Sequence, residues 1–245
     1  MPTSITPYPH EDGGKKAQVS KMFDNISNRY DQLNRVISLG SDQSWRRDLL
    51  RRAKALQPQS IIDLATGTGD LAILMAQTGA QVVKGIDISK GMLAVGQEKV
   101  KKQALDAQVA LLYGDAENIP FEDHSFDVAT VAFGIRNFEN LDQGLRDILR
   151  VLKPGGTLLI LETSVPTRFP FKQGYFAYTR LWLPLVGRLF SKDKHAYGYL
   201  SESAAHFPYG QALCEILQRN GYIQVQHSPQ TFGVATIYQA QKPQR

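Results

Sequence analysis

The fold of this chain is decided by the stretch Ile61-Ile62-Asp63-Leu64-Ala65-Thr66-Gly67-Thr68-Gly69-Asp70. Its apolar start predicts a buried strand, two glycines follow, and a helical pattern begins at Asp70. Because glycine has no side chain, the backbone can turn sharply after the strand and approach a ligand closely. A strand, a glycine-rich turn and a helix in this order indicate a nucleotide-binding crossover.

The same alternation continues along the chain. Strands are predicted at 60–65, 81–86, 109–113, 126–133 and 157–162, with helices near 70–78, 89–103 and 142–152 between them. This alternation predicts a mostly parallel sheet with helices on both faces. After a helix at 210–220, strands at 222–228 and 233–240 are expected to form an antiparallel hairpin around a turn at Pro229. The expected fold is α/β, with seven strands.

Composition divides the chain into a tail and one domain. Residues 1–18 carry prolines and glycines and few apolar groups, which predicts a flexible tail. Residues 19–245 are expected to form a single domain, with a helical cap at 19–57 and an aromatic and basic insertion at 165–208. The single cysteine, Cys214, forms no internal disulfide. Without a signal segment or a run of about 20 apolar residues, we expect a cytoplasmic protein, with membrane contact only as a peripheral protein at the inner face.

The glycine-rich turn admits two cofactors. Gly67, Gly69 and Ala72 fit the dinucleotide fingerprint, and Asp87 follows Gly67 by 20 positions, so a nicotinamide dinucleotide is admissible. However, the carboxylate of Asp70 at the helix start would repel a diphosphate. S-adenosylmethionine has no phosphate, and acids attract its sulfonium and ammonium groups. The charge pattern therefore favours S-adenosylmethionine.

Three carboxylates at successive strand ends support this cofactor. We expect Asp63 to face the methionine amino group and Asp87 to accept from both ribose hydroxyls. Asp115 is expected to accept from the adenine amino group, while the Ala116 N–H reaches a ring nitrogen. Taken alone, Asp63 is equally explained as a solvated strand-end residue, Asp115 as a turn acid and Asp70 as a helix-start residue. Their common place at the carboxyl edge of the sheet favours a binding site.

Several motifs carry a resemblance to a known family. The chain resembles class I S-adenosylmethionine-dependent methyltransferases in Asp63-Leu-Ala-Thr-Gly-Thr-Gly-Asp70, Gly85-Ile-Asp-Ile-Ser89, Gly114-Asp-Ala-Glu-Asn-Ile-Pro-Phe121 and Leu152-Lys-Pro-Gly-Gly156. It is similar more narrowly to the bacterial menaquinone/ubiquinone biosynthesis C-methyltransferases in Met22-Phe23-Asp24, Tyr30-Asp31, Trp45-Arg46, Phe133-Gly-Ile-Arg-Asn137 and Tyr199-Leu200. The resemblance covers about residues 19 to 241.

The resemblance implies an activity and further site residues. Members methylate a ring carbon of a polyprenyl hydroquinol, and the menaquinone branch converts demethylmenaquinol into menaquinol. A dual enzyme that also acts on a polyprenyl methoxybenzoquinol is the alternative. To the cofactor site the resemblance adds Gly67, Thr68, Gly69, Ile88, Met92 and Ala132. On the acceptor side it implies Tyr30, Phe133 and Tyr199, although helix packing explains Tyr30 nearly as well.

Arg136 and Asn137 are the expected catalytic residues, just beyond the fourth strand. A hydroquinol that loses a proton becomes an oxyanion, which Arg136 is expected to stabilise while Asn137 orients a hydroxyl. The alternatives are that Arg136 pairs with an acid and Asn137 caps the following turn. His195 and His206 are acid–base candidates, but surface or packing roles are more common for such histidines. No spacing marks a metal site.

Residues 168–194 combine aromatic and basic side chains. Six basic residues against one acid give this segment a net charge of +5, equal to that of the whole chain, and seven aromatic residues lie among them. This mixture suits an anionic lipid surface and a channel for a prenyl tail. A satellite core with solvated bases is the equal alternative.

Rival functions lack matching motifs. A nucleic-acid methyltransferase suits the basic charge, but base-amine enzymes place an Asn/Asp-Pro-Pro-aromatic motif where this chain has Phe133-Gly-Ile-Arg-Asn-Phe138. We therefore expect no nucleic-acid partner. An S-adenosylmethionine-binding scaffold of a quinone-biosynthesis assembly is the non-enzymatic alternative. A homo-oligomer is compatible with the sequence.

Overall fold

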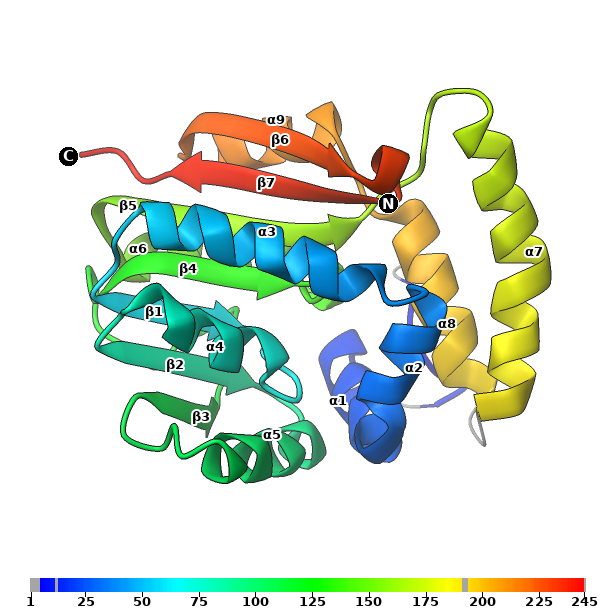
Figure 1. Cartoon of the computed structure of the whole chain (residues 1–245), viewed down its shortest axis with the longest axis horizontal. Coiled ribbons are helices and arrows are strands. Elements are labelled where there is room, and N and C mark those ends of the chain that lie inside the picture. Colours follow the sequence, from blue (N-terminus) through cyan, green and yellow to red (C-terminus); the bar gives the residue numbers. More distant parts are fainter. Residues whose placement is uncertain (1–4, 12, 191–193, 245) are drawn as a thin grey trace.

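The computed structural model describes residues 5–11, 13–190 and 194–244, except for the side chains of 183–197. Seven strands form one sheet in the order β3-β2-β1-β4-β5-β7-β6 (Figure 1). They are β1 (Ser60–Leu64), β2 (Val82–Asp87), β3 (Val109–Tyr113), β4 (Phe126–Ala132), β5 (Leu152–Thr163), β6 (Ile223–Gln230) and β7 (Ala235–Gln241). The first five run parallel, and β7 is antiparallel to β5 and β6. The predicted α/β fold and edge hairpin are confirmed.

Helices cover both faces of the sheet. On one face lie α3 (Ser41–Ala55), α4 (Asp70–Met75), continued by η2 (Ala76–Thr78), and α5 (Lys90–Lys102). On the other lie α6 (Leu141–Val151) and α9 (Gln211–Arg219). Each set encloses a hydrophobic cluster with the strand side chains, which is why the central strands are almost continuously apolar in sequence.

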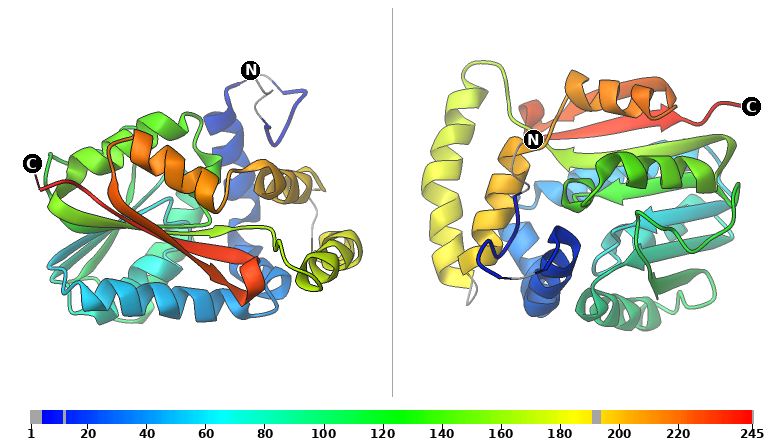
Figure 2. Two further views of the ribbon diagram at one scale, coloured as in Figure 1. Left: turned by 90° about the horizontal axis from the view of Figure 1, so that it is seen from above. Right: turned by 180° about the vertical axis from the view of Figure 1, so that it is seen from behind.

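The remaining α-helices and one 3₁₀-helix form a cap at the carboxyl end of the sheet. They are α1 (Lys15–Ile26), η1 (Ser27–Arg29), α2 (Tyr30–Ile37), α7 (Phe171–Phe190) and α8 (Lys194–His206). Figure 1 shows α1, α2 and α8 beyond the strand ends with α7 outermost, and both views of Figure 2 agree. α1 and α2 precede β1, whereas α7 and α8 lie between β5 and α9. Two segments far apart in sequence therefore build one cap.

Three predicted boundaries are wrong. α1 begins at Lys15, inside the predicted tail, and Tyr8 is buried. Gln18 orders this region, because its side chain accepts from the Tyr8 N–H at 3.0 Å and donates to two backbone carbonyls. Pro229 lies within β6, so the hairpin turn is η4 (Thr231–Gly233) instead. β5 begins at Leu152 rather than 157, with an irregularity in its pairing to β4.

Candidate functional site

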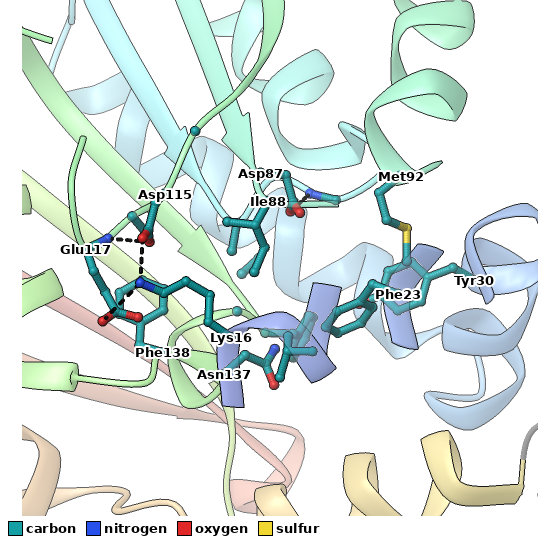
Figure 3. A pocket seen from close by; sticks show the side chains of 18 residues that line it. Lys16, Phe23, Tyr30, Asp87, Ile88, Met92, Asp115, Glu117, Asn137 and Phe138 are labelled. Carbon is teal, nitrogen blue, oxygen red and sulfur yellow. Dashed lines mark hydrogen bonds and ion pairs between the residues drawn. The ribbon is translucent and has the colours of Figure 1, made fainter. Parts of the chain in front are cut away.

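A cavity lies where the strand ends meet the cap (Figure 3). Ten of the predicted site residues line it: Tyr30, Gly67, Asp87, Ile88, Met92, Asp115, Ala116, Ala132, Phe133 and Asn137. The other five do not: Asp63, Thr68, Gly69, Arg136 and Tyr199.

The glycine-rich turn after β1 closes one side of the cavity. Gly67 has a φ of +56°, and its N–H donates to Asp87 Oδ2 at 2.7 Å. Gly69, with a φ of +76°, begins α4 from a left-handed conformation, and a Cβ there would lie 2.7 Å from the Leu111 side chain. Both positions need glycine. Gly67 forms the cavity wall, whereas Gly69 shapes the turn from behind it.

Asp87 ends β2 with both oxygens held by the backbone. Oδ2 accepts from the Gly67 N–H, and Oδ1 accepts from the Ser89 N–H at 2.8 Å. Burial raises the pKa of Asp87 to about 6, although these hydrogen bonds oppose the shift. Because each carboxylate oxygen can accept a second hydrogen bond, Asp87 retains acceptor positions for two hydroxyls. This is the arrangement that a ribose requires.

Asp63 and Thr68 lie away from the cavity, with their polar atoms already bonded. Asp63 accepts from Thr66 Oγ1 and from Thr130 Oγ1, each at 2.6 Å, and burial raises the pKa of this aspartate to about 6. Thr68 Oγ1 donates to Asp31 Oδ1 at 2.5 Å, which ties the turn to α2. Direct cofactor contact by either residue stays a prediction, and the geometry gives both a role in holding the turn.

At the other end of the cavity, Asp115 is paired with a lysine that the sequence did not reveal. Lys16 Nζ lies 2.6 Å from Asp115 Oδ2 and 3.7 Å from Glu117 Oε2, and all three residues line the cavity. Glu117 in turn accepts from the N–H groups of Glu139 and Asn140. Lys16 was missed because it lies in the predicted tail, where nothing in the sequence marks a helix that returns to β3.

The chemistry of the lining fits S-adenosylmethionine. Figure 3 shows Asp115, Asp87 and Met92 following one another along one wall, with Ile88 beside Asp87. The carboxylates accept from an amine and from hydroxyls, and the apolar side chains offer faces to an adenine ring. A Cβ at Gly67 would stand 3.9 Å from Tyr30 Cε1, an ordinary van der Waals distance, so this turn lies close to the Tyr30 ring.

The turn after β4 forms the predicted acceptor side. Phe133 has a φ of +58°, and Asn137 follows in η3 (Ile135–Asn137). A non-glycine residue in this conformation is uncommon, and such strain often marks functional sites. Tyr199 of α8 donates to Asn137 Oδ1 at 3.1 Å. This bond leaves the amide Nδ2 of Asn137 as a donor for the cavity, so Tyr199 acts on the cavity through Asn137.

Arg136 points away from the cavity and pairs with Glu162, the alternative that the sequence left open. Its Nη1 donates to Glu162 Oε1 at 2.6 Å and to the Phe133 carbonyl at 2.9 Å. Both side chains are buried. The ion pair therefore holds the strained turn at Phe133, and direct contact between Arg136 and an acceptor stays a prediction.

The two candidate histidines are not among the described residues that line this cavity. His206 is exposed, with Nδ1 2.9 Å from the Glu202 carbonyl oxygen, and the side chain of His195 lies outside the described residues. Within the described part of the chain, no group of three or more His, Cys, Asp or Glu side chains is placed to hold a metal ion.

Comparison with known proteins identifies close relatives. The model of the ubiE/COQ5 methyltransferase family matches residues 12–242. A demethylmenaquinone methyltransferase of Bacteroides fragilis is 48% identical, over 97% of this chain and 97% of its own length. Another, from Porphyromonas gingivalis, is 41% identical, over 98% of this chain and 99% of its own.

Solved structures share the fold at low identity. An S-adenosylmethionine-dependent methyltransferase of Thermotoga maritima has a TM-score of 0.60 at 17% identity, over 91% of this chain and 99% of that one. The [4+2]-cyclase SpnF has the same TM-score at 19% identity, over 95% of this chain and 98% of its own. Because a cyclase has the same fold, the fold alone does not identify the reaction. The family match identifies the reaction class: the chain belongs to the ubiE/COQ5 methyltransferase family and is a methyltransferase that uses S-adenosylmethionine.

Proposed function

We propose that this chain methylates a ring carbon of demethylmenaquinol and so forms menaquinol. The observation that carries the proposal is the nearly full-length match to relatives named demethylmenaquinone methyltransferase, at identities up to 48%. The site supports it, because Phe133 and Asn137 line the same cavity as the expected cofactor residues. Donor and acceptor would therefore meet in one enclosed space.

The reduced form of the acceptor follows from simple chemistry. A quinone is an electrophile, whereas a hydroquinol that loses a proton becomes nucleophilic at the adjacent ring carbon. S-adenosylmethionine supplies an electrophilic methyl group when bound. The chain has to align the two partners, stabilise negative charge on the acceptor oxygen and exclude water.

The residues of the cavity divide these tasks. Asp87 and Asp115 would hold the nucleoside, as their free acceptor positions allow. Asn137 Nδ2 would donate to an acceptor oxygen, since Tyr199 occupies the other end of the amide. Phe23 and Tyr30 contact each other edge to face, with ring centres 5.7 Å apart, and would exclude water from the cap side.

A panel of acceptors tests the proposal. Methyl transfer from labelled S-adenosylmethionine is measured with reduced demethylmenaquinol and, in parallel, with reduced benzoquinols with and without a methoxy group. We expect methylation of the naphthoquinol only. Methylation of a methoxybenzoquinol as well would establish the dual alternative. No product from any acceptor, despite measurable cofactor binding, would contradict the proposal and favour the scaffold.

The proposal includes peripheral contact with an anionic membrane through α7. No helix in the described ranges is long and apolar enough to span a bilayer. On one side of α7, Tyr178 Oη and Trp182 Nε1 donate to carbonyls of α2. Elsewhere on α7, Leu181 is 74% exposed, and Lys172 and Arg180 are exposed too. Apolar and basic groups together favour an anionic lipid surface. The predicted contributions of Arg188, Lys192 and Lys194 lie outside the described side chains.

Vesicle flotation tests this contact. Vesicles with phosphatidylglycerol should bind the wild type at low salt and release it at high salt. The variant Lys172→Gln/Arg180→Gln should bind less. Lys101→Gln/Lys102→Gln removes the same charge from the exposed surface of α5 and should bind like the wild type. Equal binding by both variants would count against α7 as the contact. A homo-oligomeric state stays a prediction.

A further inference from the structure

Glu162 and Arg136 form a buried pair with one free atom on each side. Glu162 Oε1 accepts from Arg136 Nη1 at 2.6 Å and from the N–H and Oγ1 of Thr163 at 2.8 and 3.1 Å. Glu162 Oε2 and Arg136 Nε are buried and have no hydrogen-bond partner among the described residues. Only 1% of the Glu162 side chain and 7% of the Arg136 side chain are exposed.

A free acceptor and a free donor within one buried pair point to missing hydrogen-bond partners. An unsatisfied buried polar atom costs about 1–3 kcal/mol, and more when it is charged. A hydroxyl can satisfy either atom, because its proton donates to a carboxylate oxygen and its own oxygen accepts from a guanidinium N–H. The hydroxyl of a hydroquinol and that of an ordered water both have this chemistry.

The pair lies directly behind the acceptor side of the cavity. Arg136 Nη1 also donates to the carbonyl of Phe133, and Asn137 is the next residue; both of these line the cavity. Glu162 follows Leu161, which pairs with Ala132 of the cavity wall. Burial raises the pKa values of Tyr175 and Tyr199, and the charge of Arg136 opposes this. Phenols from α7 and α8 thus approach the pair from the cap.

We propose that Glu162 is the general base that takes the hydroxyl proton of the acceptor through one ordered water, while the charge of Arg136 stabilises the resulting oxyanion. The inference rests on the proposed methylation of a hydroquinol. General bases act within hydrogen-bond reach of the proton or through one water. Glu162 Oε2 is a carboxylate oxygen near the acceptor side to which none of the described residues donates a hydrogen bond.

The step balances. The hydroxyl proton moves to Glu162 Oε2, and the electron pair of the O–H bond flows into the ring. The ring carbon forms a bond to the methyl group, and the electrons of the breaking carbon–sulfur bond stay on sulfur. The methylated carbon then loses its own proton to water as Glu162 returns a proton to the oxygen. One proton is released per turnover, and the carboxylate is restored.

The substitution Glu162→Gln tests this role, because it keeps the size of the side chain and removes the base. We expect kcat to fall by about 10²–10⁴-fold, which is the range for loss of general base catalysis. The dissociation constant of S-adenosylmethionine should change less than about twofold, because Glu162 does not line the cofactor cavity. Glu98→Gln makes the same change on the exposed surface of α5 and should leave kcat unchanged. A kcat for Glu162→Gln within about threefold of the wild type would overturn the proposal.

One further measurement separates a base from a structural clamp. Formate should restore turnover to Glu162→Ala, since it supplies a carboxylate but cannot hold the turn at Phe133 in the same way. No rescue by formate would show a clamp.

The outcomes also separate this inference from the proposed function. If the wild type does not methylate demethylmenaquinol, the proposed function fails first. If the wild type methylates it and Glu162→Gln does so equally well, the proposed function stands and Glu162 is not the base.

Discussion

The Asp87 carboxylate, which we propose holds the ribose, is fixed in one position by the backbone. The Gly67 and Ser89 N–H groups fix its two oxygens, so the carboxylate loses little freedom when hydroxyls bind. Its burial has a cost, because the charged form is disfavoured and the pKa rises from 3.8 to about 6. We therefore expect cofactor binding to be linked to ionisation of the Asp87 carboxylate.

This linkage predicts a pH dependence of cofactor affinity. Two ribose hydroxyls need an ionised acceptor, so the dissociation constant of S-adenosylhomocysteine should be constant above about pH 7 and rise as the pH falls through about 6. Calorimetric titrations between pH 5 and 8 measure it. Asp87→Asn should bind weakly at every pH.

Asp63→Asn is the matched control, because the pKa of Asp63 is also raised to about 6 while its side chain does not line the cavity. It should retain the pH dependence of the wild type. If Asp63→Asn lost the pH dependence of cofactor affinity while Asp87→Asn kept it, the titrating group would be Asp63, which would contradict our account.

Tyr199 should affect turnover through Asn137. Removing its hydroxyl in Tyr199→Phe frees the amide of Asn137 to rotate, and a hydrogen bond of this kind contributes about 0.5–1.5 kcal/mol. We expect kcat to fall by about threefold to tenfold with little change in cofactor affinity. Tyr113→Phe, on an exposed tyrosine of β3, is the control. An unchanged kcat in Tyr199→Phe would mean that this bond does not orient the amide.

The sequence predicted which acids line the cavity better than it predicted the residues that those acids contact. Asp87 and Asp115 line the cavity as expected, whereas Asp63 faces Thr130, its neighbour across the β1–β4 pairing. Sequence places an acid at a strand end, but the neighbouring strand decides what its side chain meets. The argument from Asp70 was incomplete for the same reason, since Lys99 Nζ lies 2.6 Å from its carboxylate and offsets its charge. The cofactor was still correctly predicted.

Two strained turns, after β1 and after β4, meet at the cavity. Ala65 has a φ of +50° and Phe133 a φ of +58°, and both line the cavity together with Gly134. A Cβ on Gly134 would lie 2.5 Å from the Ala65 Cβ. The turns can approach one another only because Gly134 has no side chain. Motif spacing predicted the first turn, but the contact between the two is visible only in three dimensions.

Gly134→Ala should therefore be costly. Overpacking at a backbone contact typically destabilises by about 1–3 kcal/mol, so we expect a lower midpoint of thermal unfolding and weaker cofactor binding. In Gly174→Ala, on α7, a Cβ meets nothing within 4 Å. That control should be neutral or stabilise by up to about 1 kcal/mol, because alanine favours a helix. Equal stability of the two variants would show that the turns can separate freely.

The whole molecule places a cap built from two distant segments over the end of a Rossmann-like sheet. Lys15 of α1 donates to the carbonyls of Arg136 and Phe138, so the N-terminal helix holds the turn after β4. The alternation of patterns predicted the mostly parallel sheet, its two layers of helices and the edge hairpin. The closure of the cap did not, because contacts between α1 and residues more than 100 positions later leave no local signal in the sequence.

The position of methylation tests the central claim most directly. Reduced demethylmenaquinol is incubated with S-adenosylmethionine that carries a deuterated methyl group, and the product is analysed by mass spectrometry and NMR. We predict one deuterated methyl group on a ring carbon, in a product that reoxidises to menaquinone with both quinone oxygens free. A methyl ether on oxygen, or no labelled product with an active cofactor site, would contradict the account.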